Sequence, residues 1–159
     1  MEHLFTPWRM DYISSVRKPG CIFCEMLEAG DDRASLIVRR SERAFLVLNR
    51  YPYTNGHLMA VPYRHAAGLD DLDPEETADV MALLSDALRA LRSLFHPDGF
   101  NIGANMGRVA GAGVEGHVHM HVVPRWNGDT NFMPVFADTR VIPQALDETY
   151  GLLAGALGS

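Results

Sequence analysis

The sequence has little cysteine, no long apolar run and no excess of basic residues, and each absence excludes a class of protein. Its 159 residues include 2 cysteines, too few for the disulfide-rich scaffold of a small secreted protein. No stretch reaches the roughly 18 to 20 apolar residues of a membrane span, and the first residues lack the apolar segment of a signal peptide. We therefore expect a cytoplasmic protein with no membrane partner.

The net charge and the phosphate-binding fingerprints restrict the classes of ligand that the protein is expected to bind. A formal net charge of -6 argues against nucleic acid as a partner, because nucleic-acid-binding proteins usually carry a clustered excess of Lys and Arg. A small anionic ligand held by local groups remains compatible with this charge. The segment Gly111-Ala-Gly-Val-Glu-Gly116 has the spacing G-x-G-x-x-G but does not follow directly on a predicted strand, and G-x-x-x-x-G-K-[ST] does not occur, so neither common phosphate-binding fingerprint is predicted.

The length and the pattern of apolar residues predict one α+β domain over residues 1–159. It comprises an N-terminal arm (1–20), a core (21–126) and a C-terminal extension (127–159). A long helix is predicted from Asp73-Pro74-Glu75-Glu76, which offers a cap and a capping box, through Phe95. A weaker helix is predicted over 143–157. Strands are predicted over 35–40, 43–49, 57–62, 100–106 and 116–123. Strands before and after one long helix favour an antiparallel sheet of about five strands.

The segment Gly116-His-Val-His-Met-His-Val-Val123 carries three of the chain's 7 histidines at alternate positions. In a strand, His117, His119 and His121 would share one face, opposite an apolar face. Two kinds of chemistry fit such a row. The imidazoles bind a metal, or one of them is a nucleophile held in one tautomer, which suits attack on phosphorus because neutral imidazole is nucleophilic near pH 7.

Two other features of the sequence help to decide between a metal site and a nucleophilic histidine. The loop 107–116 contains four glycines, whose backbone N–H groups can approach anionic oxygens; alone it would be an ordinary flexible connection, but beside the histidines it favours the nucleophile. The only cysteines lie in Cys21-Ile-Phe-Cys24. In a cytosolic chain this spacing is typical of metal binding or redox chemistry, although two small buried side chains would also explain it. A tetrahedral metal site needs two further ligands.

The segment 117–123 resembles the signature of the histidine-triad (HIT) family, His-φ-His-φ-His-φ-φ with φ apolar, at every position. Upstream segments follow the family's order as well, and the similarity covers about residues 21–126. The arm at residues 5–12 and the segment 124–132 resemble more particularly the diadenosine tetraphosphate phosphorylase and hydrolase-like branch. The upstream segments are Leu46-Val-Leu-Asn49-Arg50, Pro52, Gly56-His57-Leu-Met-Ala-Val-Pro62 and His65.

The resemblance implies a HIT-like fold and a nucleotidyl hydrolase or transferase, usually a homodimer, which acts on an adenine nucleotide or dinucleoside polyphosphate without an organic cofactor. It implies that His119 is the nucleophile, that His121 contacts the phosphate and leaving group, and that His57 supports the cluster. Asn49 matches a position that contacts the ribose, and Asn105 matches one on the phosphate side.

The resemblance also implies a structural zinc, because many bacterial members bind zinc through two cysteines and two histidines. Cys21, Cys24, His65 and His117 match those four positions. Such a closed set would be structural, since it leaves no coordination position for substrate. We expect zinc on these residues.

The loop before the triad departs from the family pattern, which commonly places Gly-Gln-Ser/Thr there. Here the residues are Gly111-Ala-Gly-Val-Glu-Gly116, so the Gln and the hydroxyl that assist the leaving group are absent. The backbone amides of Gly111 and Gly113 are expected to take part of that role. Three alternatives stay open: a nucleoside phosphoramidate or aminoacyl-adenylate hydrolase with the same nucleophile, a non-catalytic nucleotide-binding module, and a metallohydrolase with metal on all three histidines.

Overall fold

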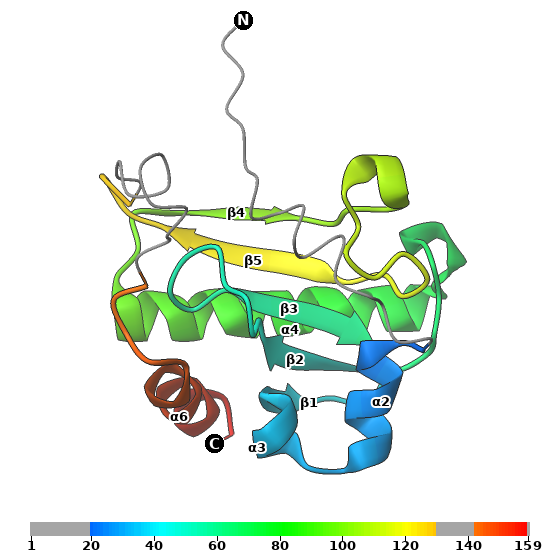
Figure 1. Ribbon diagram of the computed structural model, residues 1–159, viewed down its shortest axis with the longest axis horizontal. Helices are drawn as coiled ribbons and strands as arrows, with labels where there is room; N and C mark the ends of the chain where they lie inside the picture. The colour runs from blue at the N-terminus through cyan, green and yellow to red at the C-terminus, as the bar shows by residue number, and fades with distance from the viewer. Residues whose placement is uncertain (1–19, 130–141, 159) are drawn as a thin grey trace, which may run out of the picture.

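The computed structural model describes residues 20–129 and 142–158 (Figure 1). Most of the predicted arm, residues 1–19, lies outside these ranges, as do residues 130–141 and 159 of the predicted extension. Among the described helices, none has the length and apolar composition needed to cross a lipid bilayer.

A five-stranded antiparallel sheet forms the centre of the molecule and confirms the predicted α+β class. Its spatial order is β1-β2-β3-β5-β4, so β1 and β4 are the two edges. The order arises because β2 and β3 pair across a turn, whereas β5 returns between β3 and β4. The strands are β1 (Ile37–Arg40), β2 (Ala44–Leu48), β3 (Leu58–Pro62), β4 (Gly99–Gly103) and β5 (Met120–Arg125).

The sheet has an apolar face and a histidine face. Leu58 and Val122 are cross-strand partners and fully buried, and the adjacent His121 points to the opposite face because side chains alternate along a strand. The long helix α4 (Pro74–Phe95) packs against β2, β3 and β5, and its Arg92 guanidinium lies 5.2 Å above the Phe100 ring, on the same face as Val122. Figure 1 shows α4 behind the sheet. The histidines therefore lie on the face that α4 leaves uncovered.

Both ends of α4 follow the sequence prediction. The Asp73 carboxylate accepts a hydrogen bond from the Glu76 N–H at 2.8 Å, and the Glu76 carboxylate accepts one from the Asp73 N–H at 3.0 Å. This capping box, with Pro74 in the first turn, satisfies two backbone donors that would otherwise lack partners. The helix ends where His96 adopts a left-handed backbone with φ 48°.

The second predicted helix is α6 (Leu146–Leu157), which begins slightly later than expected and packs against α4 and β1. Its Tyr150 hydroxyl donates to the Ile37 carbonyl at 3.2 Å. There are two short 3-10 helices in the described chain. The first, η1 (Leu69–Asp71), precedes α4, and the second, η2 (Arg108–Ala110), follows β4.

The sequence did not predict the helices α2 (Ile22–Ala29) and α3 (Asp32–Ser35). The prediction of a strand from residue 35 was wrong at its start, because Ser35 ends α3 and Leu36 has a left-handed backbone with φ 63°. The Asp31 carboxylate caps α3 by accepting from the Ala34 N–H at 3.0 Å. Both short helices lie beside the β1 edge (Figure 1).

The histidine segment is a strand only from Met120 onward, so the prediction of a strand from Gly116 was wrong for residues 116–119. The β3–β5 ladder stops at the pair Ala60 and Met120, and β3 ends at Pro62, which has no N–H to offer a neighbour. The Pro62 carbonyl instead accepts a hydrogen bond from His117 Nε2 at 2.8 Å. The Pro62 carbonyl is thus bonded to the His117 side chain instead of to a backbone N–H of a neighbouring strand, and the chain leaves the sheet at this point.

Glu76 should make the fold sensitive to acid. Hydrogen bonds from the Arg64 guanidinium, at 2.6 and 2.8 Å, and from the Asp73 N–H hold the pKa of Glu76 at about 2. Because this pKa is lowered from 4.5, the stabilisation is complete above pH 4.5 and is lost as the pH falls toward 2. Glu76→Gln should therefore lower the Tm at pH 7, and its difference from wild type should shrink as the pH falls through that window.

The control is Glu75→Gln, because the Glu75 side chain is 70% exposed in its ion pair with Arg43. Thermal unfolding followed by circular dichroism measures both variants. A Tm difference for Glu76→Gln that stays constant with pH, or that Glu75→Gln matches, contradicts this account.

Candidate active site and metal cluster

Aromatic and imidazole rings form a continuous row on the histidine face of the sheet. The centroids of the His57 and His121 rings lie 5.1 Å apart, and those of His121 and His119 lie 4.8 Å apart. Beyond His119, the buried Phe23 ring of α2 lies 5.0 Å from His119 and 5.4 Å from His117. His119, His121 and His57 therefore form one group, and Phe23 separates them from His117.

The proton positions on His57 and His121 follow from their hydrogen-bond partners. His57 Nδ1 lies 3.2 Å from the Tyr53 N–H, which can only donate, and 3.3 Å from the Asn49 amide nitrogen. His57 Nδ1 is therefore the unprotonated nitrogen, and its proton sits on Nε2. That Nε2–H donates to His121 Nδ1 at 2.9 Å. His121 in turn carries its proton on Nε2.

His119 has the opposite tautomer. Its Nδ1 lies 2.9 Å from the backbone carbonyl of His117, which can only accept, so Nδ1 carries the proton and Nε2 keeps its lone pair. Burial, which leaves 4% of the residue exposed, lowers the pKa of His119 below its ordinary value of 6.5, against the smaller opposing effect of that hydrogen bond. A neutral imidazole with a free Nε2 lone pair is a nucleophile at neutral pH.

The expected nucleotide-binding residues lie at two places. Asn49 follows β2, contacts His57 as described and accepts a hydrogen bond from the Tyr51 N–H at 2.9 Å. Asn105 follows β4 and donates to the Gly111 carbonyl at 3.4 Å across the glycine-rich loop. The Gly111 N–H donates to the Arg108 carbonyl at 2.9 Å within η2, so this amide already has a partner. Gly113 lies further along the same loop and is half-buried.

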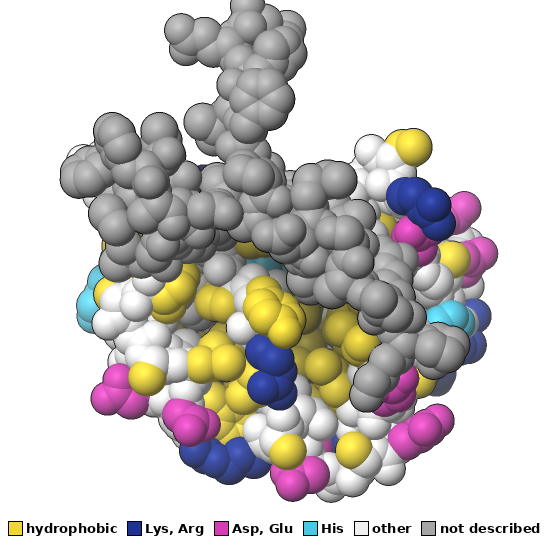
Figure 2. Space-filling view, viewed as in Figure 1, with side chains coloured by type: hydrophobic (Ala, Val, Ile, Leu, Met, Phe, Trp, Pro, Cys, Tyr) yellow, Lys and Arg dark blue, Asp and Glu magenta, His cyan; other side chains and the backbone are white. Residues whose placement is uncertain are grey.

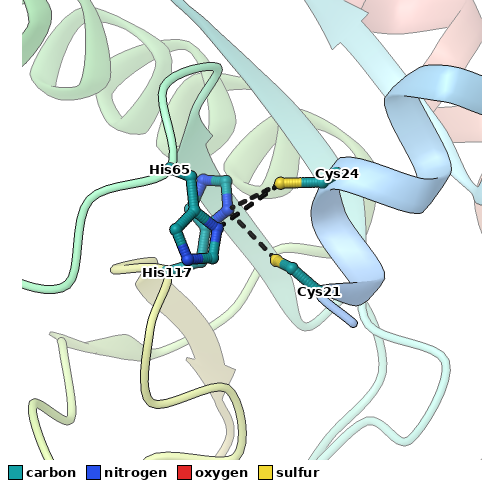
Figure 3. Close-up of side chains that lie close together, drawn as sticks. All are labelled: Cys21, Cys24, His65 and His117. Atoms are coloured by element: carbon teal, nitrogen blue, oxygen red, sulfur yellow. Dashed lines mark hydrogen bonds between the residues drawn. The ribbon is translucent and has the colours of Figure 1, made fainter. Parts of the chain in front are cut away.

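A second group of residues lies at the other end of the row, at the start of α2 (Figure 3). The Cys21 sulfur is 3.2 Å from His117 Nδ1, and the Cys24 sulfur is 3.5 Å from His65 Nδ1 and 3.7 Å from His117 Nδ1. The four ligand atoms all lie within 4.8 Å of one another. The fold thus brings together the four residues that the family resemblance implied, and they could hold a metal ion.

His117 is shared by both groups. Its Nε2 donates to the Pro62 carbonyl, so its Nδ1 lone pair faces the two sulfurs, while its backbone carbonyl accepts from His119. Burial is the main cause that lowers the pKa of His117 below 6.5 and favours the neutral ring that a metal requires. The position of His117 therefore affects both the metal ligands and the tautomer of His119.

Sequence reasoning missed three residues of this site. Phe23 is the middle of the Cys-Ile-Phe-Cys motif, yet nothing in the motif indicates that its ring contacts His119. Tyr53 lies in a connection whose sequence indicates only a turn, and Pro62 ends an apolar run. The proline at the end of the predicted strand 57–62 was the one available signal, because a proline has no N–H with which to continue a ladder.

The visible side of the molecule in Figure 2 is the one opposite α4. Hydrophobic side chains gather near its centre with basic side-chain atoms among them, and acidic side chains lie around its rim.

Comparisons with known proteins identify the family. The HIT domain family matches residues 32–128 of this chain. A Mycobacterium tuberculosis protein named AP-4-A phosphorylase is 41% identical over 163 residues, which cover 97% of this chain and 83% of that protein. The chain therefore belongs to the HIT family, as its histidine segment predicted, and the expected enzyme class, a nucleotide-processing enzyme of this family, agrees with these matches.

Solved structures share the fold. A zinc-bound histidine triad family protein from Mycobacterium smegmatis has a TM-score of 0.70 and 33% identity, covering 87% of this chain and 94% of its own. A histidine triad nucleotide-binding protein from Sulfolobus tokodaii has a TM-score of 0.67 and 25% identity, covering 86% of this chain and 88% of its own. The HIT-like fold expected from the sequence is thus confirmed.

The tautomers can be tested without any substrate. Long-range nitrogen–proton NMR correlations on the labelled protein at neutral pH should show His57 and His121 protonated at Nε2 and His119 protonated at Nδ1, because each has a partner that fixes its role. The exposed His96 is the control and should show a mixture of tautomers. A His119 ring protonated at Nε2 would contradict the assignment.

Proposed function

We propose that the protein is a nucleotidyl transferase or hydrolase that acts on dinucleoside polyphosphates, of which diadenosine tetraphosphate is the test compound, through a covalent intermediate on His119. The observation that carries the proposal is the hydrogen bond from His119 Nδ1 to the His117 carbonyl. It leaves a neutral, buried Nε2 as the nucleophile, beside a His121 ring that carries its proton on the nitrogen facing away from His57.

The reaction takes place in two steps that share these groups. His119 Nε2 attacks the α-phosphorus, the bond from phosphorus to the bridging oxygen breaks, and that oxygen departs as a phosphate anion that accepts a hydrogen bond from the His121 Nε2–H. A nucleoside monophosphate is then attached to His119. In the second step water or phosphate attacks the same phosphorus and the phosphorus–nitrogen bond breaks, which releases His119 Nε2; when water is the acceptor, its proton passes to solvent. Both histidines then have their starting tautomers.

His57 acts as the support of His121 in this scheme. It donates from Nε2 to His121 Nδ1, and the Tyr53 N–H and the Asn49 amide hold its own Nδ1. Because His57 donates to His121 Nδ1, the His121 proton stays on Nε2, where it can hydrogen-bond to the departing oxygen. We assign Asn49 to the ribose, since its side chain lies beside His57, and Asn105 and Gly113 to the phosphates, with Gly111 at the turn that shapes the loop.

The acceptor that completes the reaction is proposed from the relatives. The name of the Mycobacterium tuberculosis protein favours phosphate over water. Incubation with diadenosine tetraphosphate should give ADP plus ATP when inorganic phosphate is present, whereas AMP plus ATP would identify a hydrolase. Absence of any product with both acceptors would contradict the proposed substrate class.

His119→Ala should abolish turnover, by about 10³-fold or more in kcat, because the covalent step then has no nucleophile. The same variant should keep its circular dichroism spectrum and its metal content, since His119 is not among the four clustered ligands. His96→Asn serves as the control, because asparagine tolerates the left-handed backbone at that exposed position. Loss of bound metal from His119→Ala would indicate a metal-ligand role instead.

We further propose that zinc binds Cys21, Cys24, His65 and His117. A tetrahedral ion with Zn–S near 2.3 Å and Zn–N near 2.0 Å separates sulfur from nitrogen by about 3.5 Å. The sulfur–nitrogen separations in the structure are 3.2, 3.5 and 3.7 Å, so two thiolates and two imidazoles fit. When bound, zinc would cross-link α2 to the segment before β5 and would take no part in the reaction. The zinc-bound relative from Mycobacterium smegmatis supports this choice of metal.

Removal of one sulfur should therefore remove the metal. We expect about one zinc per chain in the wild-type protein and a large loss in Cys24→Ser, together with a lower Tm, because a structural site contributes directly to folding stability. Elemental analysis and thermal unfolding measure the two effects. Glu28→Gln, on an exposed turn of the same helix, is the control. A wild-type protein without zinc, or a Cys24→Ser protein that retains it fully, would contradict the assignment.

Several expectations from the sequence stay predictions. They are the homodimer, the single domain over the whole chain, the cytoplasmic location, and the lack of an organic cofactor or of nucleic acid as a partner.

A further inference from the structure

The backbone at the start of α2 permits a disulfide between its two cysteines. The Cys21 carbonyl accepts the first hydrogen bond of the helix, from the Glu25 N–H at 3.0 Å, so Cys21 is the N-cap and Cys24 lies in the first turn. Residues three apart on an α-helix have Cα atoms about 5 Å apart. A disulfide needs a Cα separation of roughly 4.4 to 6.8 Å, so these two positions can be bridged without unwinding the helix.

The two sulfurs are close to each other as well as to the imidazoles. Both cysteines are free thiols, and their sulfurs belong to the group of ligand atoms that all lie within 4.8 Å of one another. Figure 3 shows Cys21 and Cys24 projecting from the same end of α2 toward His65 and His117. Rotation of the two side chains is therefore enough to exchange their imidazole neighbours for each other.

The cluster has a buried side and an accessible side. His117 is fully buried, whereas His65 is exposed, and Cys21 and Cys24 are both half-buried. The Cys24 sulfur lies 3.5 Å from Nδ1 of the exposed His65, and the Cys21 sulfur lies 3.2 Å from Nδ1 of the buried His117. A small oxidant thus reaches Cys24 from the His65 side, and Cys21 lies directly behind it.

The same segment of chain holds the nucleophile. The His117 ring contacts Cys21, and the His117 backbone carbonyl accepts the hydrogen bond from His119 Nδ1. Phe23 lies between the two cysteines in the sequence, and its ring lies 5.0 Å from the His119 ring. A change in the bonding of the sulfurs therefore acts on both residues that hold His119.

We propose that Cys21 and Cys24 form a peroxide-sensitive dithiol whose oxidation to a disulfide releases zinc and switches off the nucleophile. This inference rests on the zinc site of the proposed function. Sulfurs that bind zinc are thiolates, and the thiolate is the form that attacks an oxidant. The Cys-x-x-Cys pair thus combines the two kinds of chemistry that its spacing is typical of, metal binding and redox chemistry.

Hydrogen peroxide supplies both oxidising equivalents. The Cys24 thiolate attacks one peroxide oxygen, a sulfur–oxygen bond forms, the oxygen–oxygen bond breaks, and hydroxide leaves, which gives a sulfenic acid. The Cys21 thiolate then attacks the Cys24 sulfur, the disulfide forms, the sulfur–oxygen bond breaks, and a second hydroxide leaves. The two sulfurs together lose two electrons, and the peroxide is reduced to two hydroxide ions. The disulfide has no thiolate left to hold the metal.

Peroxide treatment of the zinc-loaded wild-type protein tests the switch. A chromogenic chelator should detect about one zinc released per chain. Mass spectrometry of the peptide that contains both cysteines should show the loss of two hydrogen atoms. The kcat with diadenosine tetraphosphate should fall about 10- to 100-fold, the range for loss of contacts that support a site, and NMR should show a mixture of tautomers on His119. A dithiol reductant added together with zinc should reverse all four changes.

Three controls make the result specific to the disulfide. Reduced protein that has lost its zinc to a chelator should recover with zinc alone, whereas the oxidised protein should also need the reductant. Cys21→Ser lacks the second thiol, so peroxide should add oxygen to Cys24 without forming a disulfide. Methionine sulfoxide requires a dedicated reductase, so a change that a dithiol reverses does not come from methionine.

The outcomes separate the switch from the function on which it rests. Zinc that stays bound and cysteines that stay reduced while methionines become oxidised overturn the switch. So does a disulfide that forms with release of zinc but leaves kcat and the His119 tautomer unchanged. A wild-type protein that never contains zinc overturns the proposed metal site, and the switch with it. A zinc-containing protein that cleaves no dinucleoside polyphosphate overturns the proposed substrate, while the zinc, disulfide and tautomer measurements still decide the switch.

Discussion

The hydrogen bond from His119 Nδ1 to the His117 carbonyl is the interaction on which the site depends. It fixes the tautomer of a buried imidazole, and so decides which nitrogen can attack. The second chain of bonds, from the Tyr53 N–H through His57 to His121, fixes the opposite tautomer on the neighbouring ring. One ring therefore presents a lone pair and the next presents a proton, although both are histidines two residues apart.

This arrangement requires the histidine segment to leave the sheet. If residues 117–119 continued the ladder, their backbone would pair with the neighbouring strand, and the His117 carbonyl would have a different partner. Pro62 ends that ladder, and its carbonyl draws the His117 ring toward the two cysteines. The buried Phe23 ring packs against the rings of both His117 and His119. The cysteine helix α2 therefore supports the nucleophile through packing as well as through His117.

Much of the fold follows from local patterns in the sequence. The capping box at Asp73 and the alternating strands predicted α4 and the five-stranded sheet, and the histidine signature predicted the family and the residues that converge. The departure at His117 could not be predicted, because it depends on a proline 55 residues away in the sequence. The helix α2 was missed for a related reason, since it is 8 residues long and is held by tertiary contacts rather than by a side-chain cap.

The central claim is that His119 Nε2, and no other imidazole nitrogen, carries the nucleotide during turnover. The direct measurement is to quench the wild-type enzyme early in its reaction with radiolabelled diadenosine tetraphosphate under conditions that preserve phosphorus–nitrogen bonds, and to map the label by peptide mass spectrometry. We expect one adenylyl group on the peptide that contains His119, bonded through Nε2 in the phosphorus NMR spectrum of the trapped protein. A label on His117, His121 or His57, or substrate turnover without any labelled protein, would contradict this account.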